Sequence, residues 1–184
     1  MEPKRRNAPR TKEKILRAAQ RAFSDLGYAR AGIRDIAAIA GVSSTLLLRY
    51  YGSKAGLFQA ALIDAMRLEP VLAVPRERIG ERFAAQFVDT ALEIMPPSMI
   101  ALSTGDEEAR EIAARVVREH VIGPLAKWLG PPDATARAIE MTMLSISFVL
   151  FTRQIPLTRS AKSTDKQLAQ WLARSLQAIV DGGS

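Results

Sequence analysis

The 184-residue chain contains no cysteine and a single histidine. The absence of cysteine excludes disulfide bonds, thiolate-bound metals and a cysteine nucleophile. One histidine without cysteine makes a poor metal site, and no glycine-rich phosphate loop or nucleophile paired with a base is visible near it. We therefore expect no metal, no cofactor and no enzymatic activity.

Long apolar segments are also scarce. The apolar, uncharged stretch from Met141 to Thr152 has 12 residues, fewer than the roughly 20 that a membrane-spanning helix needs. The charged N-terminus, Met1 to Arg6, is not followed by an apolar segment, so it does not resemble a secretory signal. We expect a soluble, cytoplasmic protein with no membrane partner.

Positive charge is concentrated in the N-terminal third of the chain. Residues 1–54 hold 12 Lys or Arg against 4 Asp or Glu, a net charge of +8, whereas residues 55–184 hold 14 against 15, a net charge of −1. This asymmetry predicts a polyanion-binding head on a nearly neutral body, with nucleic acid or an anionic membrane surface as the partner. We favour nucleic acid, because the apolar residues of the head are needed for its own core.

Apolar residues recur with helical periodicity along the whole chain, and no segment shows the alternation of a strand. The pattern predicts an all-α fold of about nine helices. The first helix is expected to begin at Thr11, as N-cap, and to end at Gly27, as the C′ residue. Residues 1–10 are expected to form a disordered basic arm. The remaining helices are expected at 33–40, 44–50, 54–68, 79–94, 98–104, 106–129 with a kink at Gly123-Pro124, 134–151 and 164–179.

The short helices at 33–40 and 44–50 are separated by a turn that contains Gly41, and together they form a helix-turn-helix. Such a motif places its second helix in the major groove of DNA. Leu47, with Leu48 or Tyr51, is expected to face the core. Hydroxyl and apolar side chains of this helix can contact base edges, while basic residues and a tyrosine can contact phosphates. The expected DNA-binding residues are Arg34, Ser43, Ser44, Thr45, Leu46, Arg49, Tyr50 and Lys54.

Two segments, Ile36–Ser43 (IAAIAGVS) and Tyr50–Phe58 (YYGSKAGLF), resemble the TetR family of bacterial repressors. The resemblance covers residues 11–58. The family commonly has Gly at the position of Thr45, Tyr at that of Leu48, and Ser or Thr at that of Gly32. Gly32 can still cap a helix. The other two departures leave docking in the groove plausible but make the operator sequence unpredictable.

The resemblance implies a helix-turn-helix DNA-binding domain over 11–54 and a helical effector-binding and dimerisation body over 55–184. It implies a homodimer in which the helices at 134–151 and after Thr164 pair with their copies on a palindromic operator. A small apolar effector would bind in the body and release the repressor from DNA. The candidate effector contacts are Phe83, Phe87, Met95, Met99, His120, Met143 and Phe148.

Two alternatives remain open. The first is an all-α enzyme whose pocket uses His120 or Glu119 as a base. The second is a DNA-binding activator that responds to no ligand. Loss of an activity in the His120→Ala variant, with DNA binding retained, would indicate the enzyme. Failure of every small molecule to release the protein from DNA would indicate the ligand-independent activator.

Overall fold

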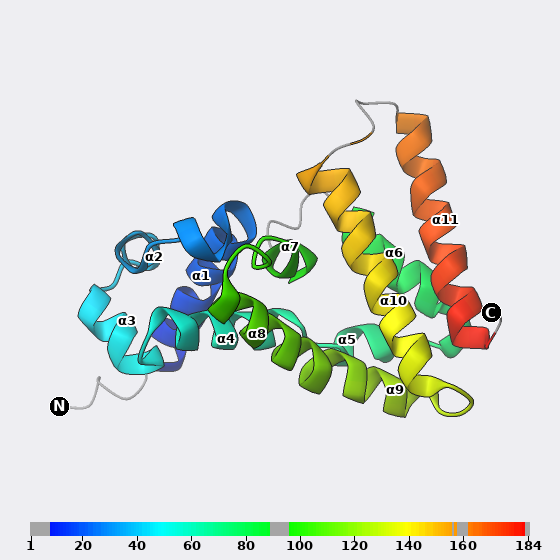
Figure 1. Ribbon diagram of the computed structural model, residues 1–184, viewed down its shortest axis with the longest axis horizontal. Helices are drawn as coiled ribbons and strands as arrows, with labels where there is room; N and C mark the ends of the chain where they lie inside the picture. Colours follow the sequence, from blue (N-terminus) through cyan, green and yellow to red (C-terminus); the bar gives the residue numbers. More distant parts are fainter. Residues whose placement is uncertain (1–7, 89–95, 156, 158–161, 183–184) are drawn as a thin grey trace.

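The computed structural model describes residues 8–88, 96–155, 157 and 162–182, and every regular element in these ranges is helical (Figure 1). The head consists of α1 (Ala8–Arg30), α2 (Ile33–Ala40), α3 (Ser44–Tyr51) and α4 (Lys54–Ala65). The connecting elements are α5 (Glu69–Leu72) and the 3-10 turn η1 (Arg76–Arg78). The body consists of α6 (Ile79–Val88), α7 (Pro96–Ala101), α8 (Glu107–Val117), η2 (Arg118–Ile122), α9 (Gly123–Leu129), α10 (Ala134–Val149), η3 (Leu150–Gln154) and α11 (Lys162–Asp181).

The prediction of an all-α fold is confirmed. The described elements agree with about nine helices when the one-turn α5 is set aside and the continuous run α8–η2–α9 is counted once. The kink predicted at Gly123-Pro124 is instead a π-helical turn, η2, directly before it. Because Pro124 has no N–H to bond the preceding turn, the wider π turn accommodates it without breaking the helix.

The first helix differs from the prediction at its start, whereas Gly27 interrupts it where its end was predicted. It begins at Ala8, so Thr11 lies inside the helix and is not its N-cap. Pro9 stands in the first turn, where a missing N–H has no helical partner to lose. Gly27 interrupts the helix with φ 73° and ψ 169°, a conformation that glycine adopts without a steric penalty, and helical residues follow it to Arg30.

Other helix ends also differ from the prediction or cannot be compared with it. The helix expected over 98–104 lies at Pro96–Ala101. The fourth helix ends at Ala65 rather than near Leu68. The last helix begins at Lys162, ahead of the expected start. The helix expected over 79–94 is described only as far as Val88, so its predicted end lies outside the described residues.

The core of the head is an aromatic cluster enclosed by helices. The rings of Phe23 and Phe58 pack edge to face with centroids 5.0 Å apart, and those of Tyr28 and Phe58 with centroids 5.2 Å apart. Such geometry adds to the free energy gained from burying the rings. Ile15 and Leu47 close the same core from α1 and α3.

One long helical run, α8–η2–α9, takes part in both hydrophobic cores. Ile112 and Val116 of α8 complete the core of the head, whereas Leu125 and Leu129 of α9 belong to the core that α6, α10 and α11 form. Figure 1 shows the run extending from the head to the base of α10. The domain boundary at residue 54 therefore stays a prediction, because helices beyond it help to bury the core of the head.

Two arginines connect the C-terminal ends of helices in the body through hydrogen bonds to backbone oxygens. Arg137, which is only 8% exposed, donates to the backbone oxygens of Gly130, Pro132, Ile179 and Val180 at 2.7–3.2 Å. A guanidinium is well placed there, since the last carbonyls of a helix lack helical partners and carry partial negative charge. Arg76 joins the same cluster by bonding the oxygens of Trp128, Leu129 and Val180.

The packing of α6 against α11 needs a glycine. A Cβ on Gly80 would overlap the backbone oxygen of Ala173, so a larger residue would push the two helices apart. The N–H of Gly80 also donates to Oε1 of Gln177 at 3.0 Å. This close approach positions α11 beside α10, with which it also packs (Figure 1).

Part of α10 remains apolar and exposed. Ala134–Gln154 is long and apolar enough to cross a membrane. Its most apolar 18 residues have a mean hydropathy of 1.4, and 33% of them are buried in the fold. This span is longer than the stretch Met141–Thr152 because it includes Arg137 and other charged residues. A single helix of this kind is weak evidence for a membrane span, because the core helix of a soluble protein can be equally long and apolar.

Candidate nucleic-acid interface and ligand pocket

The helix-turn-helix is formed by α2 and α3, as predicted. Gly41 ends α2 in the left-handed conformation with φ 67°, and its N–H bonds back to the oxygens of Ala37 and Ala38. Ser43 then caps α3, because its Oγ accepts a hydrogen bond from the N–H of Leu46 at 3.1 Å. This cap fixes the start of α3 and with it the direction in which its first side chains point.

The described structure separates the two sides of α3. Leu47 is fully buried, as predicted, and Tyr51 is half-buried, whereas Leu48 is 39% exposed and does not join the core. Thr45 and Arg49 are exposed. The remaining candidates on and around this helix are Ser44, Leu46 and Tyr50, which are half-buried, and the capping Ser43 and Arg34 of α2, which are exposed.

Lys12 contacts both tyrosines at the end of α3, although it is absent from the predicted DNA-binding residues. Its ammonium lies 5.4 Å from the centroid of the Tyr50 ring, and its backbone oxygen accepts a hydrogen bond from the Tyr51 hydroxyl at 3.3 Å. These contacts hold the end of α3 against α1. The basic run of residues 10–21 was the signal in the sequence that could have identified this residue.

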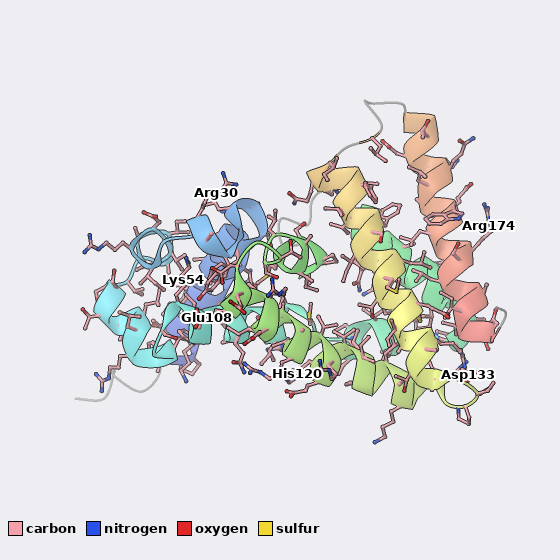
Figure 2. All side chains as sticks on the ribbon, in the orientation of Figure 1. Arg30, Lys54, Glu108, His120, Asp133 and Arg174 are labelled. Carbon is pink, nitrogen blue, oxygen red and sulfur yellow. The ribbon has the colours of Figure 1, made fainter. Side chains whose placement is uncertain are left out.

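Lys54 is held against the end of α1 rather than extended into solvent. Its Nζ donates to the oxygen of Ala29 at 3.2 Å and lies 4.6 Å above the ring of Tyr28. The Tyr28 hydroxyl in turn donates to Oε2 of Glu108 at 2.6 Å. Figure 2 shows Lys54 and Glu108 close together where α8 meets the head.

This bond connects the head with α8 and changes the ionisation of the tyrosine. Burial raises the pKa of Tyr28 well above its usual range, and the hydrogen bond to Glu108 and the negative charges of Glu108 and Asp106 raise it further. Asp106 itself is the N-cap of α8, since its carboxylate accepts from the N–H of Ala109 at 3.0 Å. Glu108 therefore has a specific partner, in addition to the favourable position of an acidic residue at a helix N-terminus.

A second basic surface lies on the head between α1 and α2. Lys14, Arg17 and Arg21 line a hollow there together with Ile39, which is exposed. Arg17 also pairs with Glu13 at 3.2 Å. This surface extends the positive charge of the head beyond α3 and Lys54.

The body contains a pocket of about 540 Å³ beside the end of α4. This volume lies in the range of small-molecule sites. Of the candidate effector contacts, Phe83 and Phe87 line the pocket. Other apolar lining residues come from several helices, including Val71, Val117, Leu125, Met141 and Ile146.

The other candidate effector contacts that the structure describes do not line this pocket. Met99 is fully buried in the core of the head, and Phe148 is buried in the core of the body. Met143 points outward from α10 and is 62% exposed, and His120 is half-buried in η2. Met95 lies outside the described residues. Periodicity could place these side chains on helices but could not show which helix faces enclose the pocket.

The charged side chains on the described wall of the pocket are both arginines. Arg67 follows α4 and Arg82 lies on α6, and both are exposed. Arg67 is also paired with Asp64 through Nη2 and Oδ1. The described wall holds no histidine or carboxylate, the groups that the enzyme hypothesis requires as a base.

The pocket and the head are connected through α4 and α8. Gln20 of α1 donates to the oxygen of Ala61 at 3.1 Å and to Oδ2 of Asp64 at 3.0 Å. On the other side, α8 contacts the head through Glu108 and reaches the pocket through Val117. Within the part of the chain that the structure describes, no three His, Asp or Glu side chains gather to hold a metal ion.

Comparison with known proteins agrees with this arrangement. Residues 15–61 match the bacterial regulatory proteins of the tetR family, and residues 77–180 match the tetracyclin repressor-like C-terminal domain. The HTH-type transcriptional regulator BetI of Stenotrophomonas maltophilia (strain R551-3) is 35% identical over 80 residues, which are 43% of this chain and 41% of that protein. The matched region thus spans less than half the length of this curated relative.

Solved structures share the fold over almost the whole chain. A structure assigned to a TetR-family transcriptional regulator of Rhodococcus sp. has a TM-score of 0.72 at 18% identity and covers 94% of this chain and 99% of that one. A structure assigned to a transcriptional regulator of Saccharomonospora viridis in complex with choline has a TM-score of 0.64 at 16% identity and covers 92% of this chain and 96% of that one. The two matched regions together include the helix-turn-helix and the pocket-bearing body, and the chain therefore belongs to the tetR family of bacterial regulatory proteins, which are DNA-binding transcriptional regulators.

Proposed function

We propose that this chain is a cytoplasmic, homodimeric repressor that a small effector releases from a palindromic DNA operator. The observation that carries the proposal is the presence, in one chain, of an exposed recognition helix within residues 1–54, whose net charge is +8, and an apolar pocket in the body. The family to which the chain belongs supports both parts. Choline bound to the Saccharomonospora viridis protein supports a small molecule as the effector.

For DNA binding, α3 enters the major groove with Thr45 and Arg49 directed at it, because these two side chains are exposed. Ser44 and Leu46 stand beside them. Tyr50 and Lys54 contact phosphates at the end of the helix, and Arg34 contacts phosphates from α2. Ser43 has its oxygen committed to the cap, so its contribution is to hold α3 in position and to offer its hydroxyl proton.

For dimerisation, α10 and α11 pair with their copies. Ile139, Met143 and Phe151 are exposed along α10 and η3, and Trp171 is 45% exposed on α11. An exposed apolar surface of this kind is typical of a subunit interface. A two-fold axis through these helices presents two copies of α3 to successive major grooves, about 34 to 36 Å apart.

For release, the effector must bind the DNA-incompetent arrangement of the two heads more tightly than the competent one. The end of α4 borders the pocket at Met66, and α8 connects the pocket to the head at Glu108. A ligand that displaces either helix changes the separation of the two recognition helices. The operator spacing then no longer fits the dimer.

The first test is fluorescence anisotropy of the full chain on DNA from upstream of its own gene and on a scrambled duplex, over a salt series. We expect tighter binding to the upstream DNA and a steep loss of affinity with salt, because phosphate contacts release counterions. Equal, weak binding to both duplexes would contradict the proposal.

Variants of residues in the head distinguish phosphate contacts from base contacts. Tyr50→Ala and Lys54→Ala should weaken binding to every duplex, whereas Thr45→Ala should change the preference among operator sequences by about 1–3 kcal/mol per base pair. Lys127→Ala, at an exposed lysine of α9, is the matched control and should leave binding unchanged. Equal losses on all sequences for the three head variants would refute the assignment of Thr45 to a base.

A further inference from the structure

The lining of the pocket is mostly apolar, and its charged side chains among the described residues are Arg67 and Arg82. Phe83, Phe87, Leu125 and Met141 supply much of the apolar wall. The hydroxyls that reach the wall already donate to backbone oxygens of their own helix, Thr142 to Ala138 and Ser145 to Met141, both at 2.8 Å. The interior hydroxyls therefore have no free proton for a ligand, which favours a hydrocarbon body inside.

The charge on this lining is positive. Arg67 and Arg82 line the pocket and are exposed, and no carboxylate is on the described wall with them. Within the described residues, Arg82 makes no ion pair that would neutralise it. A guanidinium binds a carboxylate through two parallel hydrogen bonds and repels a cationic head group.

We propose that the pocket binds an amphipathic anion, with its hydrocarbon body against the phenylalanines and a carboxylate held by Arg67 and Arg82. This inference rests on the proposed role of the pocket as the effector site and specifies the chemical class of the effector. It replaces an uncharged apolar effector with a singly charged one. The two arginines determine specificity for the charged head, and the apolar wall determines the size of the body.

Arg67 also connects the wall of the pocket to the head. Its guanidinium is paired with Asp64, and the same carboxylate accepts a hydrogen bond from Gln20, which lies on α1 and is 4% exposed. A ligand carboxylate competes with Asp64 for Arg67. Once Arg67 turns to the ligand, Asp64 loses its cation while it remains packed against α1, and the contact between α4 and α1 shifts. Arg82 has no such connection to the head, so its role is limited to binding the carboxylate of the ligand.

The test uses isothermal titration calorimetry of the full chain with three probes of equal chain length: octanoate, octanol and octyltrimethylammonium. Octanoate should bind at least about tenfold more tightly than either of the other two. The variants R67Q and R82Q should each weaken octanoate by about tenfold and leave octanol unchanged. R118Q, at an exposed arginine of η2 away from the pocket wall, is the matched control and should bind octanoate normally.

Measuring release from DNA distinguishes a residue that only binds octanoate from one that also couples octanoate binding to release. At saturating octanoate, R82Q should leave the operator as the unaltered protein does. R67Q should already bind the operator more weakly without octanoate, because Asp64 has lost its cation, and octanoate should weaken that binding no further. An R67Q variant that binds the operator normally without octanoate and is released by it would overturn the coupling through Asp64. Octanol or the ammonium probe binding as tightly as octanoate, or no binding of any of the three, would overturn the ligand class.

The proposed function can fail independently of this inference. Its test is the preference for the upstream DNA in the absence of any ligand, so none of the three probes is present in that experiment. A protein that prefers that DNA but ignores octanoate refutes the inference alone. A protein that binds octanoate but shows no DNA preference refutes the proposed function alone.

Discussion

The head and the body are both built from amphipathic helices, but they use them differently. In the head, Phe23, Phe58 and Leu47 are fully buried, and the helices fill the space between them. In the body, the helices leave a pocket of about 540 Å³ and an exposed apolar surface that includes Met143. The head therefore offers a fixed surface to DNA, whereas the body keeps volume and surface available for a ligand and a second subunit.

The largest expected effect tests this difference in packing. Phe58→Ala should lower the free energy of unfolding by about 3–5 kcal/mol, because it opens a cavity between Phe23 and Tyr28. Phe83→Ala should cost less, since it enlarges a pocket that already exists. Urea unfolding at one protein concentration measures both. Equal losses would mean that the pocket is closed in solution.

The next largest effect on stability is expected in the arginine cluster of the body. Arg137→Met should lower the stability by about 3 kcal/mol, because four backbone oxygens lose a charged donor in a buried place. Arg76→Met is the matched control and should cost less, because Arg76 is exposed and water can replace it. Thermal unfolding followed by circular dichroism gives both values. A change within error for Arg137→Met would show that the cluster contributes little.

The proposed dimer surface on α10 and α11 can be disrupted without changing a residue of the head. Met143→Glu should shift the protein towards the monomer and weaken operator binding by about tenfold or more, because a carboxylate would be buried at the interface. Thr135→Glu, at an exposed residue of the first turn of α10, is the control and should remain dimeric. Sedimentation velocity and anisotropy measure the two effects. A dimeric Met143→Glu variant would place the interface elsewhere.

The smallest effect concerns alkaline pH at the junction between head and body. Burial first, and then Glu108, raise the pKa of Tyr28, and burial also raises the pKa of Tyr51. Because the unfolded tyrosines lose their protons at about pH 10, the unfolded state binds fewer protons there, and the stability should fall as the pH rises above that value. Urea unfolding over a pH series, with Tyr28→Phe as comparison, should show a shallower fall in the variant. An identical slope would exclude Tyr28 as a cause.

The sequence was a good guide where local rules decide the structure. Ser43, Gly41 and Ser53 start or end helices as capping residues should, and the helix-turn-helix lies where its motif predicted. Leu48 shows the limit, because periodicity on an eight-residue helix cannot distinguish a core position from an exposed one beside it. Thr11 shows another, since Pro9 permits a helix start ahead of a good capping residue.

The pocket was harder to foresee for a different reason. Phe83 and Phe87 were chosen as large apolar residues of the body and do line it, but Met99 and Phe148 satisfy the same criterion and fill cores instead. Arg67 and Arg82 were missed, because a charged residue on an amphipathic helix is usually only solvated. No pattern in the sequence places these two arginines on the wall of one pocket.

The sequence by itself determined the all-α class, the helix-turn-helix and the concentration of positive charge in the head, because capping, periodicity and charge act over a few neighbouring residues. The tertiary structure decided which faces meet. It brought Tyr28 to Glu108 across 80 residues, and Gln20 to Asp64 across 44. It also left the pocket open between α4, α6 and α10. Such contacts depend on how whole helices pack, and packing is set by side-chain shape over long separations rather than by local propensity.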